Sequence, residues 1–64
     1  MAYRIDYFKE GELTASATWT GHFDEAIQVA ESGLALHQAD FYRVIDLDGS
    51  NAEVASGRTD AQGP

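Results

Sequence analysis

The chain has 64 residues and no cysteine, and its eleven acidic and four basic residues give a formal net charge of −7. A chain this short forms one small domain whose core has to be stable without disulfides or thiolate metal sites. The basic residues are Arg4, Lys9, Arg43 and Arg58, each isolated along the chain. Binding to nucleic acid or to anionic lipid depends on clustered lysine and arginine, so we expect neither partner.

The first six residues carry both acid and base and no apolar signal segment, and no apolar run approaches the ~20 residues that cross a bilayer. We therefore expect a soluble cytoplasmic protein that does not bind a membrane.

Two alternating segments begin the chain. Residues 3–7 alternate large apolar and charged side chains, as in a half-buried strand, and Phe8 adds an aromatic ring to the opposite face. The polar residues 9–12 contain one glycine and predict a hairpin turn. Residues 13–20 have the clearest strand pattern, because apolar side chains occupy one face and hydroxyl side chains the other. These segments predict a β-hairpin that ends at Gly21.

Residues 24–38 have the period of an amphipathic helix. Asp24 is the expected N-cap, and Glu25 lies in the first turn, where the helix dipole favours an anion. Gly33 costs about 1 kcal/mol relative to alanine in a helix. Its place on the inward face therefore predicts a close approach to the sheet, under the Trp19 indole. The full predicted inward face is Phe23, Ala26, Ile27, Ala30, Gly33, Leu34 and His37.

Val29 and Leu36 lie beside that inward face, seven residues apart. This flanking stripe has two interpretations. Either the buried arc of the helix is wide, or the stripe contacts another chain.

Residues 41–47 predict a third strand with apolar side chains on both faces, which is typical of a central or doubly covered strand. Residues 48–51 predict a turn, and residues 52–56 predict a fourth, weaker strand. The predicted fold class is α+β with the order ββαββ, one helix packed on one face of a small antiparallel sheet. The predicted domain spans residues 1–57, and residues 58–64 have no apolar anchor and predict a disordered tail.

No segment matches the spacing of a catalytic or metal-binding motif. Residues 46–53 resemble a calcium loop, but Gly49 and Glu53 do not fall at EF-hand positions, and the same residue types favour a hairpin turn. His22 and His37 lie at opposite ends of the helix and cannot share one metal within a chain. The serine and threonine row has no histidine in register. We therefore expect a protein that is not an enzyme and has no catalytic residue, cofactor, metal site or small-molecule substrate.

The aromatic residues outnumber those that one helix can cover. They are Tyr3, Tyr7, Phe8, Trp19, Phe23, Phe41 and Tyr42. Phe8, together with Phe41 or Tyr42 depending on the strand register, should lie on the sheet face away from the helix. Either these rings are isolated exposed aromatics, or a partner covers them. Self-association through that face or through an edge strand would enlarge the core. The candidate interface residues are Phe8, Phe41, Tyr42, Val29 and Leu36.

Two resemblances add to this interpretation. Residues 25–30 (Glu-Ala-Ile-Gln-Val-Ala) and 39–49, which end in Asp-Leu-Asp-Gly, resemble small uncharacterised bacterial proteins; this likeness implies a fold without an activity. Residues 3–34 are similar to the start of HicB-type antitoxins, in which two strands precede a helix opened by a Glu-Ala pair. The chain has Trp-Thr-Gly-His at residues 19–22, where those proteins have Pro-Asp-Leu-Pro-Gly. This second resemblance implies an acidic protein that binds a small basic ribonuclease.

Our main hypothesis from the sequence is a non-enzymatic protein-interaction module that forms a homodimer through its sheet. The alternative is an acidic antitoxin-like or inhibitor protein that binds a small basic partner.

Overall fold

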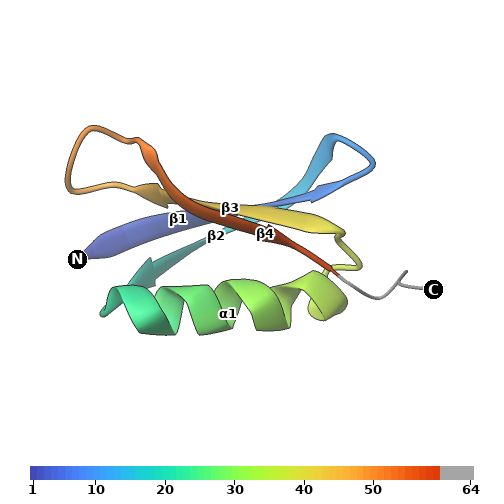
Figure 1. The fold of residues 1–64 in the computed structure, drawn as a ribbon, viewed down its shortest axis with the longest axis horizontal. Coiled ribbons are helices and arrows are strands. Elements are labelled where there is room, and N and C mark those ends of the chain that lie inside the picture. The colour runs from blue at the N-terminus through green and yellow to red at the C-terminus, as the bar shows by residue number, and fades with distance from the viewer. Residues whose placement is uncertain (60–64) are drawn as a thin grey trace.

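The computed structural model describes residues 1–59, and in them one helix lies on one face of a four-stranded antiparallel sheet (Figure 1). The elements are β1 (Ala2–Lys9), β2 (Glu12–Thr20), α1 (Phe23–Leu36), β3 (Phe41–Asp46) and β4 (Glu53–Arg58). The predicted fold class and the ββαββ order are confirmed.

β4 continues past the predicted end of the domain. Arg58 is the last residue of β4 and pairs with Phe41, so it belongs to the sheet and not to a tail. The backbone N–H of Thr59 donates to the carbonyl of Asp40 at 3.0 Å, which extends the ladder by one more bond. The rest of the predicted tail, residues 60–64, lies outside the described residues.

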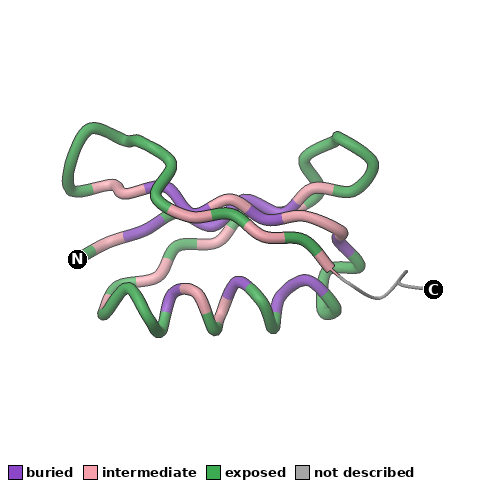
Figure 2. Tube along the Cα trace, viewed as in Figure 1, coloured by how far each residue is buried: buried purple, intermediate pink, exposed green. Residues whose placement is uncertain are grey.

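The strand order is β2-β1-β3-β4, so β1 and β3 are the inner strands. β2 and β3 both run antiparallel to β1 and are therefore parallel to each other, and α1 crosses over β1 to connect them. Figure 2 shows the buried residues in the inner strands and on the side of α1 that faces them. The core cluster comprises Tyr3, Ile5, Tyr7, Ala26, Ala30, Leu34, Ala39, Tyr42 and Val44.

The helix begins one residue earlier than predicted. Its N-cap is His22 rather than Asp24, with extended backbone angles (φ −82°, ψ 152°). The carboxylate of Glu25 accepts the backbone N–H of His22 at 3.3 Å, which is the return bond of a capping box. Glu25 therefore favours His22 as the cap residue, because it lies three positions after it.

The helix also ends two residues earlier than predicted. Gln38 has a left-handed backbone with φ +56°. Its N–H donates to the carbonyl of Ala35 at 3.2 Å, and the N–H of Ala39 donates to that of Leu34 at 2.8 Å. These two bonds form a Schellman motif, which satisfies carbonyls of the last turn and ends the helix.

Gly33 allows α1 to lie directly on Tyr7 of β1. A Cβ atom at position 33 would overlap the hydroxyl and the ring of Tyr7. The Tyr7 hydroxyl donates to the carbonyl of Val29 at 3.2 Å. The close approach predicted at Gly33 is confirmed, but the prediction that the Trp19 indole lies beneath it is wrong. The reason is that the helix packs mainly on the inner strands β1 and β3 and not on the edge strand β2.

We expect Gly33→Ala to destabilise the fold by about 1–3 kcal/mol, because the overlap of the added methyl with Tyr7 outweighs the ~1 kcal/mol gain in helix propensity. Chemical denaturation followed by circular dichroism measures the change. Ser32→Ala, at the exposed neighbouring position, is the control and should change stability by less than about 0.5 kcal/mol.

Combining Gly33→Ala with Tyr7→Phe removes the oxygen nearest to the added methyl and should recover part of the loss. Strictly additive effects in this double-mutant cycle would show that the two residues are not in contact.

Candidate protein-interaction surfaces

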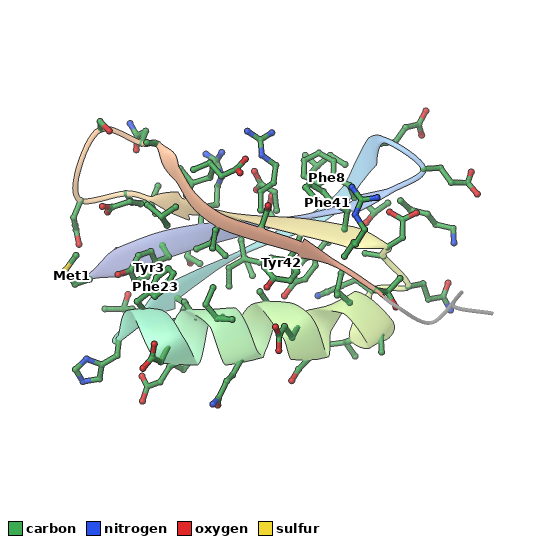
Figure 3. The ribbon with its side chains drawn as sticks, viewed as in Figure 1. Met1, Tyr3, Phe8, Phe23, Phe41 and Tyr42 are labelled. Atoms are coloured by element: carbon green, nitrogen blue, oxygen red, sulfur yellow. The ribbon has the colours of Figure 1, made fainter. Side chains whose placement is uncertain are left out.

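The five predicted interface residues do not share one surface. Figure 3 shows Phe8 and Phe41 on the sheet face away from α1 and Tyr42 between the sheet and α1. The rings of Phe8 and Phe41 are half-buried, with centroids 5.8 Å apart. On α1, Val29 is half-buried, whereas Leu36 is 79% exposed. The structure thus divides the predicted set into one pair on the reverse side of the sheet, one pair on α1 and one core residue.

Tyr42 is the core residue, with only 4% of its surface exposed. It pairs with Tyr7 across the β1–β3 ladder, and cross-strand partners share a face, so both tyrosines point towards the helix. A Cβ atom at Gly57 of β4 would lie 2.7 Å from the Tyr42 ring, so this glycine makes room for it. Of the two alternatives predicted beside Phe8, the register selects Phe41.

We call the sheet face away from α1 the reverse face. Its centre is polar. Asp6 is 8% exposed, and its carboxylate accepts hydrogen bonds from Ser16 Oγ at 2.7 Å and from Arg4 Nε at 3.0 Å. Beside this network, Arg43 Nε donates to Glu53 Oε1 at 2.8 Å. The aromatic rings predicted on the reverse face therefore do not occupy its central part.

Aromatic side chains lie at one end of the reverse face. The register places Leu13, Phe8 and Phe41 in one row across three strands, with Arg58 next to Phe41. Arg43 Cζ lies 6.0 Å from the centroid of the Phe8 ring, and Arg58 Cζ lies 5.6 Å from that of Phe41. These cation–π contacts partly cover the two rings, so the apolar part of this face is small.

The fold also gathers basic residues that are isolated in the sequence. Arg4, Arg43 and Arg58 all lie on the reverse face, because each is in register with another residue of that face. Sequence reasoning missed this cluster, since it depends on pairing between distant strands. Arg4 and Arg43 each lie between apolar residues in a predicted strand, which is a local signal for a sheet position, but Arg58 lies between Gly57 and Thr59 and has no such signal.

A second apolar surface lies between β2 and α1, and we call it the β2–α1 groove. The helix packs on β1, β3 and β4, and a groove remains beside β2, lined by Ala17 and Trp19 on the strand and by Val29, Leu36 and His37 on the helix. Trp19 is half-buried, and its Nε1 has no hydrogen-bond partner among residues 1–59. The flanking stripe predicted at Val29 and Leu36 is thus one wall of this groove. Trp19, which was predicted to lie over Gly33, is on the β2 side of the groove.

The two aspartates of the segment that resembles a calcium loop accept backbone hydrogen bonds. Asp46 Oδ1 accepts the N–H of Asp48 at 2.9 Å, and Asp48 Oδ2 accepts the N–H of Ala2 at 2.7 Å. The segment connects β3 to β4, as predicted for a turn.

The two histidines flank α1 as its N-cap and C-cap residues, and the ring centroid of His37 lies 4.7 Å from that of Tyr7. Within residues 1–59, no three histidine, aspartate or glutamate side chains come together as metal ligands. None of the helices in this part of the chain is long and apolar enough to cross a membrane.

Comparison with known proteins finds no significant similarity: no protein-family model, curated protein or solved structure matches the chain. The two resemblances drawn from the sequence therefore stay predictions.

We expect the free energy of unfolding to fall above pH 10. Burial raises the pKa of Tyr7, and burial together with the charge and hydrogen bonding of Glu31 raises the pKa of Tyr42. Unfolded tyrosine titrates near pH 10. Just above pH 10 the unfolded state therefore loses these protons while the folded state keeps them. The stability that is fully present below pH 10 is lost as the pH rises through the folded-state pKa values.

Thermal melts at a series of alkaline pH values measure this effect. Tyr42→Phe should flatten the dependence, and Glu31→Gln should flatten it less, because burial is the larger cause of the raised Tyr42 pKa. An unfolding midpoint that does not fall above pH 10 would contradict the assignment.

Proposed function

We propose that this chain is a non-enzymatic protein-interaction module that self-associates through its sheet. The β2–α1 groove is the observation that supports the proposal. Its helix wall carries Leu36, which is 79% exposed, and its floor carries the half-buried Trp19. A domain of about 60 residues buries about 60% of its unfolded surface, a smaller share than larger domains bury, and a twofold contact over this groove would enlarge that share. The cytoplasm remains the location we propose.

The mass of the full chain in solution tests self-association. We expect sedimentation equilibrium at micromolar and higher concentrations to give twice the chain mass of 7.0 kDa. Each copy carries a net charge of −7, so added salt should screen the repulsion between copies and strengthen the dimer.

Leu36→Asp should raise the dissociation constant by roughly tenfold or more, the equivalent of about 1.4 kcal/mol. Ala35→Asp is the matched control, because it places the same charge at the next exposed position of the last turn. A mass of 7.0 kDa at every concentration and salt level would refute the proposed function.

A specific observation also supports the alternative function, an acidic protein that binds a small basic partner. Asp24, Glu25 and Glu31 are exposed on α1, and none of them forms an ion pair within residues 1–59, whereas three of the four basic residues lie on the reverse face. The helix side of the molecule is therefore acidic. Binding of a basic partner there would weaken with added salt, which is the opposite of the dependence expected for self-association.

A further inference from the structure

The described sheet has two edge strands, and they differ in their protection against pairing with another chain. β4 has six residues, charged side chains at both ends (Glu53 and Arg58), and a register shift at Val44/Ile45 of its partner strand. β2 has nine residues, and its one charged residue is Glu12 at its start. From residue 15 to residue 20 it follows β1 in regular register. Proteins usually blunt edge strands with short length, charge or bulges, and β2 has these features only at its first residues.

The backbone of β2 offers unpaired hydrogen-bonding groups along this regular part. The N–H of Gly21 donates to the carbonyl of Met1 at 2.9 Å. Pairs in an antiparallel ladder alternate between bonded and non-bonded, so Trp19 and Ala17 also direct their backbone groups towards β1. Ser16 and Thr18, which lie between them, direct their N–H and C=O groups away from the sheet.

We propose that a second copy of this chain pairs antiparallel along β2, about a twofold axis near Ser16, to form one continuous eight-stranded sheet with both helices on the same face. This inference rests on the proposed function and specifies the surface through which the chain self-associates.

The charge distribution favours this partner and this orientation. Between Leu13 and Thr20 the strand is uncharged, so two copies with a charge of −7 meet along a neutral strip. With the axis at Ser16, the two Glu12 residues lie at opposite ends of the strand pair, roughly 27 Å apart at 3.4 Å per residue. That separation exceeds the screening length of about 8 Å at physiological salt. Parallel pairing would place the two Glu12 residues side by side.

The edge of β2 alone is too small for a stable interface, so the proposed dimer must also bury the β2–α1 groove. A strand of nine residues is roughly 30 Å long, and with a sheet thickness of roughly 10 Å its edge provides about 300 Å². A stable interface buries about 800 Å² per partner, about one-fifth of the chain's 4172 Å² surface. The β2–α1 groove lies directly beside the edge and is the adjacent surface that can supply the remainder.

The spacing of the two helices agrees with this requirement. With each helix centred between β1 and β3, their axes would be about four strand spacings apart, roughly 19 Å. A helix with its side chains is about 10 Å wide, which leaves a corridor of about 9 Å between the two helices. Trp19 and Leu36 of both copies lie along that corridor and are large enough to fill it.

Stacking of two reverse faces is a less favourable contact. It would remove the Arg4–Asp6 and Arg43–Glu53 ion pairs from water, and the cost of desolvating ion pairs can exceed their attraction.

Amide hydrogen exchange of the full chain, measured by NMR across a concentration series, tests the proposal. In a dimer paired along β2, the outward amides of Ser16 and Thr18 should exchange roughly tenfold or more slowly at high concentration than at low concentration. The internal control is β4. The N–H of Thr59 points to Asp40, so by the same alternation the amides of Ser56 and Arg58 point outward, and they should exchange rapidly throughout.

Matched substitutions at the two edges provide a second measurement. Thr18→Pro removes an outward N–H that β1 does not use and should abolish the dimer, whereas Ser56→Pro makes the same change on β4 and should leave it intact. Thr18→Lys and Ser56→Lys repeat the comparison without removing an N–H, and they replace the proline variants if one of those does not fold. Thr18→Lys should weaken the dimer roughly tenfold or more, because a charge on an edge strand disfavours pairing with another chain. Circular dichroism confirms the fold of each variant.

The other outcomes have distinct meanings. A dimer in which Ser16 and Thr18 exchange freely, or in which Ser56 and Arg58 become protected instead, overturns the β2 assignment and leaves self-association standing. A monomer at all concentrations overturns both the assignment and the proposed function.

Discussion

The contact between Tyr7 and the backbone of α1 at Gly33 controls how the helix sits on the sheet. Tyr7 is 1% exposed, and its hydroxyl, the one polar group of the side chain, donates to the carbonyl of Val29. A matching contact lies on the other inner strand, where Gly57 of β4 makes room for the ring of Tyr42. Tyr7 and Tyr42 are thus each accommodated by a glycine on a neighbouring element. Because the helix is held over the inner strands, it cannot also cover β2, and the apolar side chains of β2 stay open.

Most basic side chains lie on one side of the molecule, and the acidic side chains of α1 lie on the other. The arginines lie on the reverse face, where Asp6 and Glu53 pair with two of them and aromatic rings lie against Arg43 and Arg58. The outer surface of α1 carries carboxylates, and none of the residues in its last turn is basic. The net charge of −7 is therefore not spread evenly. The side of the molecule formed by β2 and the flank of α1 lies between these two charged surfaces, and its groove is lined mainly by apolar side chains, with Glu25 among the lining residues.

Local patterns in the sequence predict the elements well, because alternation and helical period depend on neighbouring residues. The fold class and element order, the buried positions Ala26, Ala30 and Leu34, and the close approach at Gly33 follow from such patterns. Strand order and register depend on pairing between distant segments, and a shift of one residue exchanges the two faces of a strand. Periodicity therefore cannot decide whether Phe41 or Tyr42 faces the helix. It also cannot show that Trp19 is on an edge strand, or that three arginines share one face.

The central position of β1 has a consequence for the kinetics of folding. β1 reaches β2 through two turn residues, Glu10 and Gly11, both with positive φ, so this hairpin closes locally and costs little chain entropy. Its other neighbour, β3, arrives only after the whole helix has been traversed, and the contacts between these two strands span more than thirty residues. Non-local pairing of this kind slows folding. The helix that connects β2 to β3 and leaves β2 uncovered thus also separates β1 from β3 in the sequence. The formation of the β1–β3 pair is therefore among the steps that limit the folding rate.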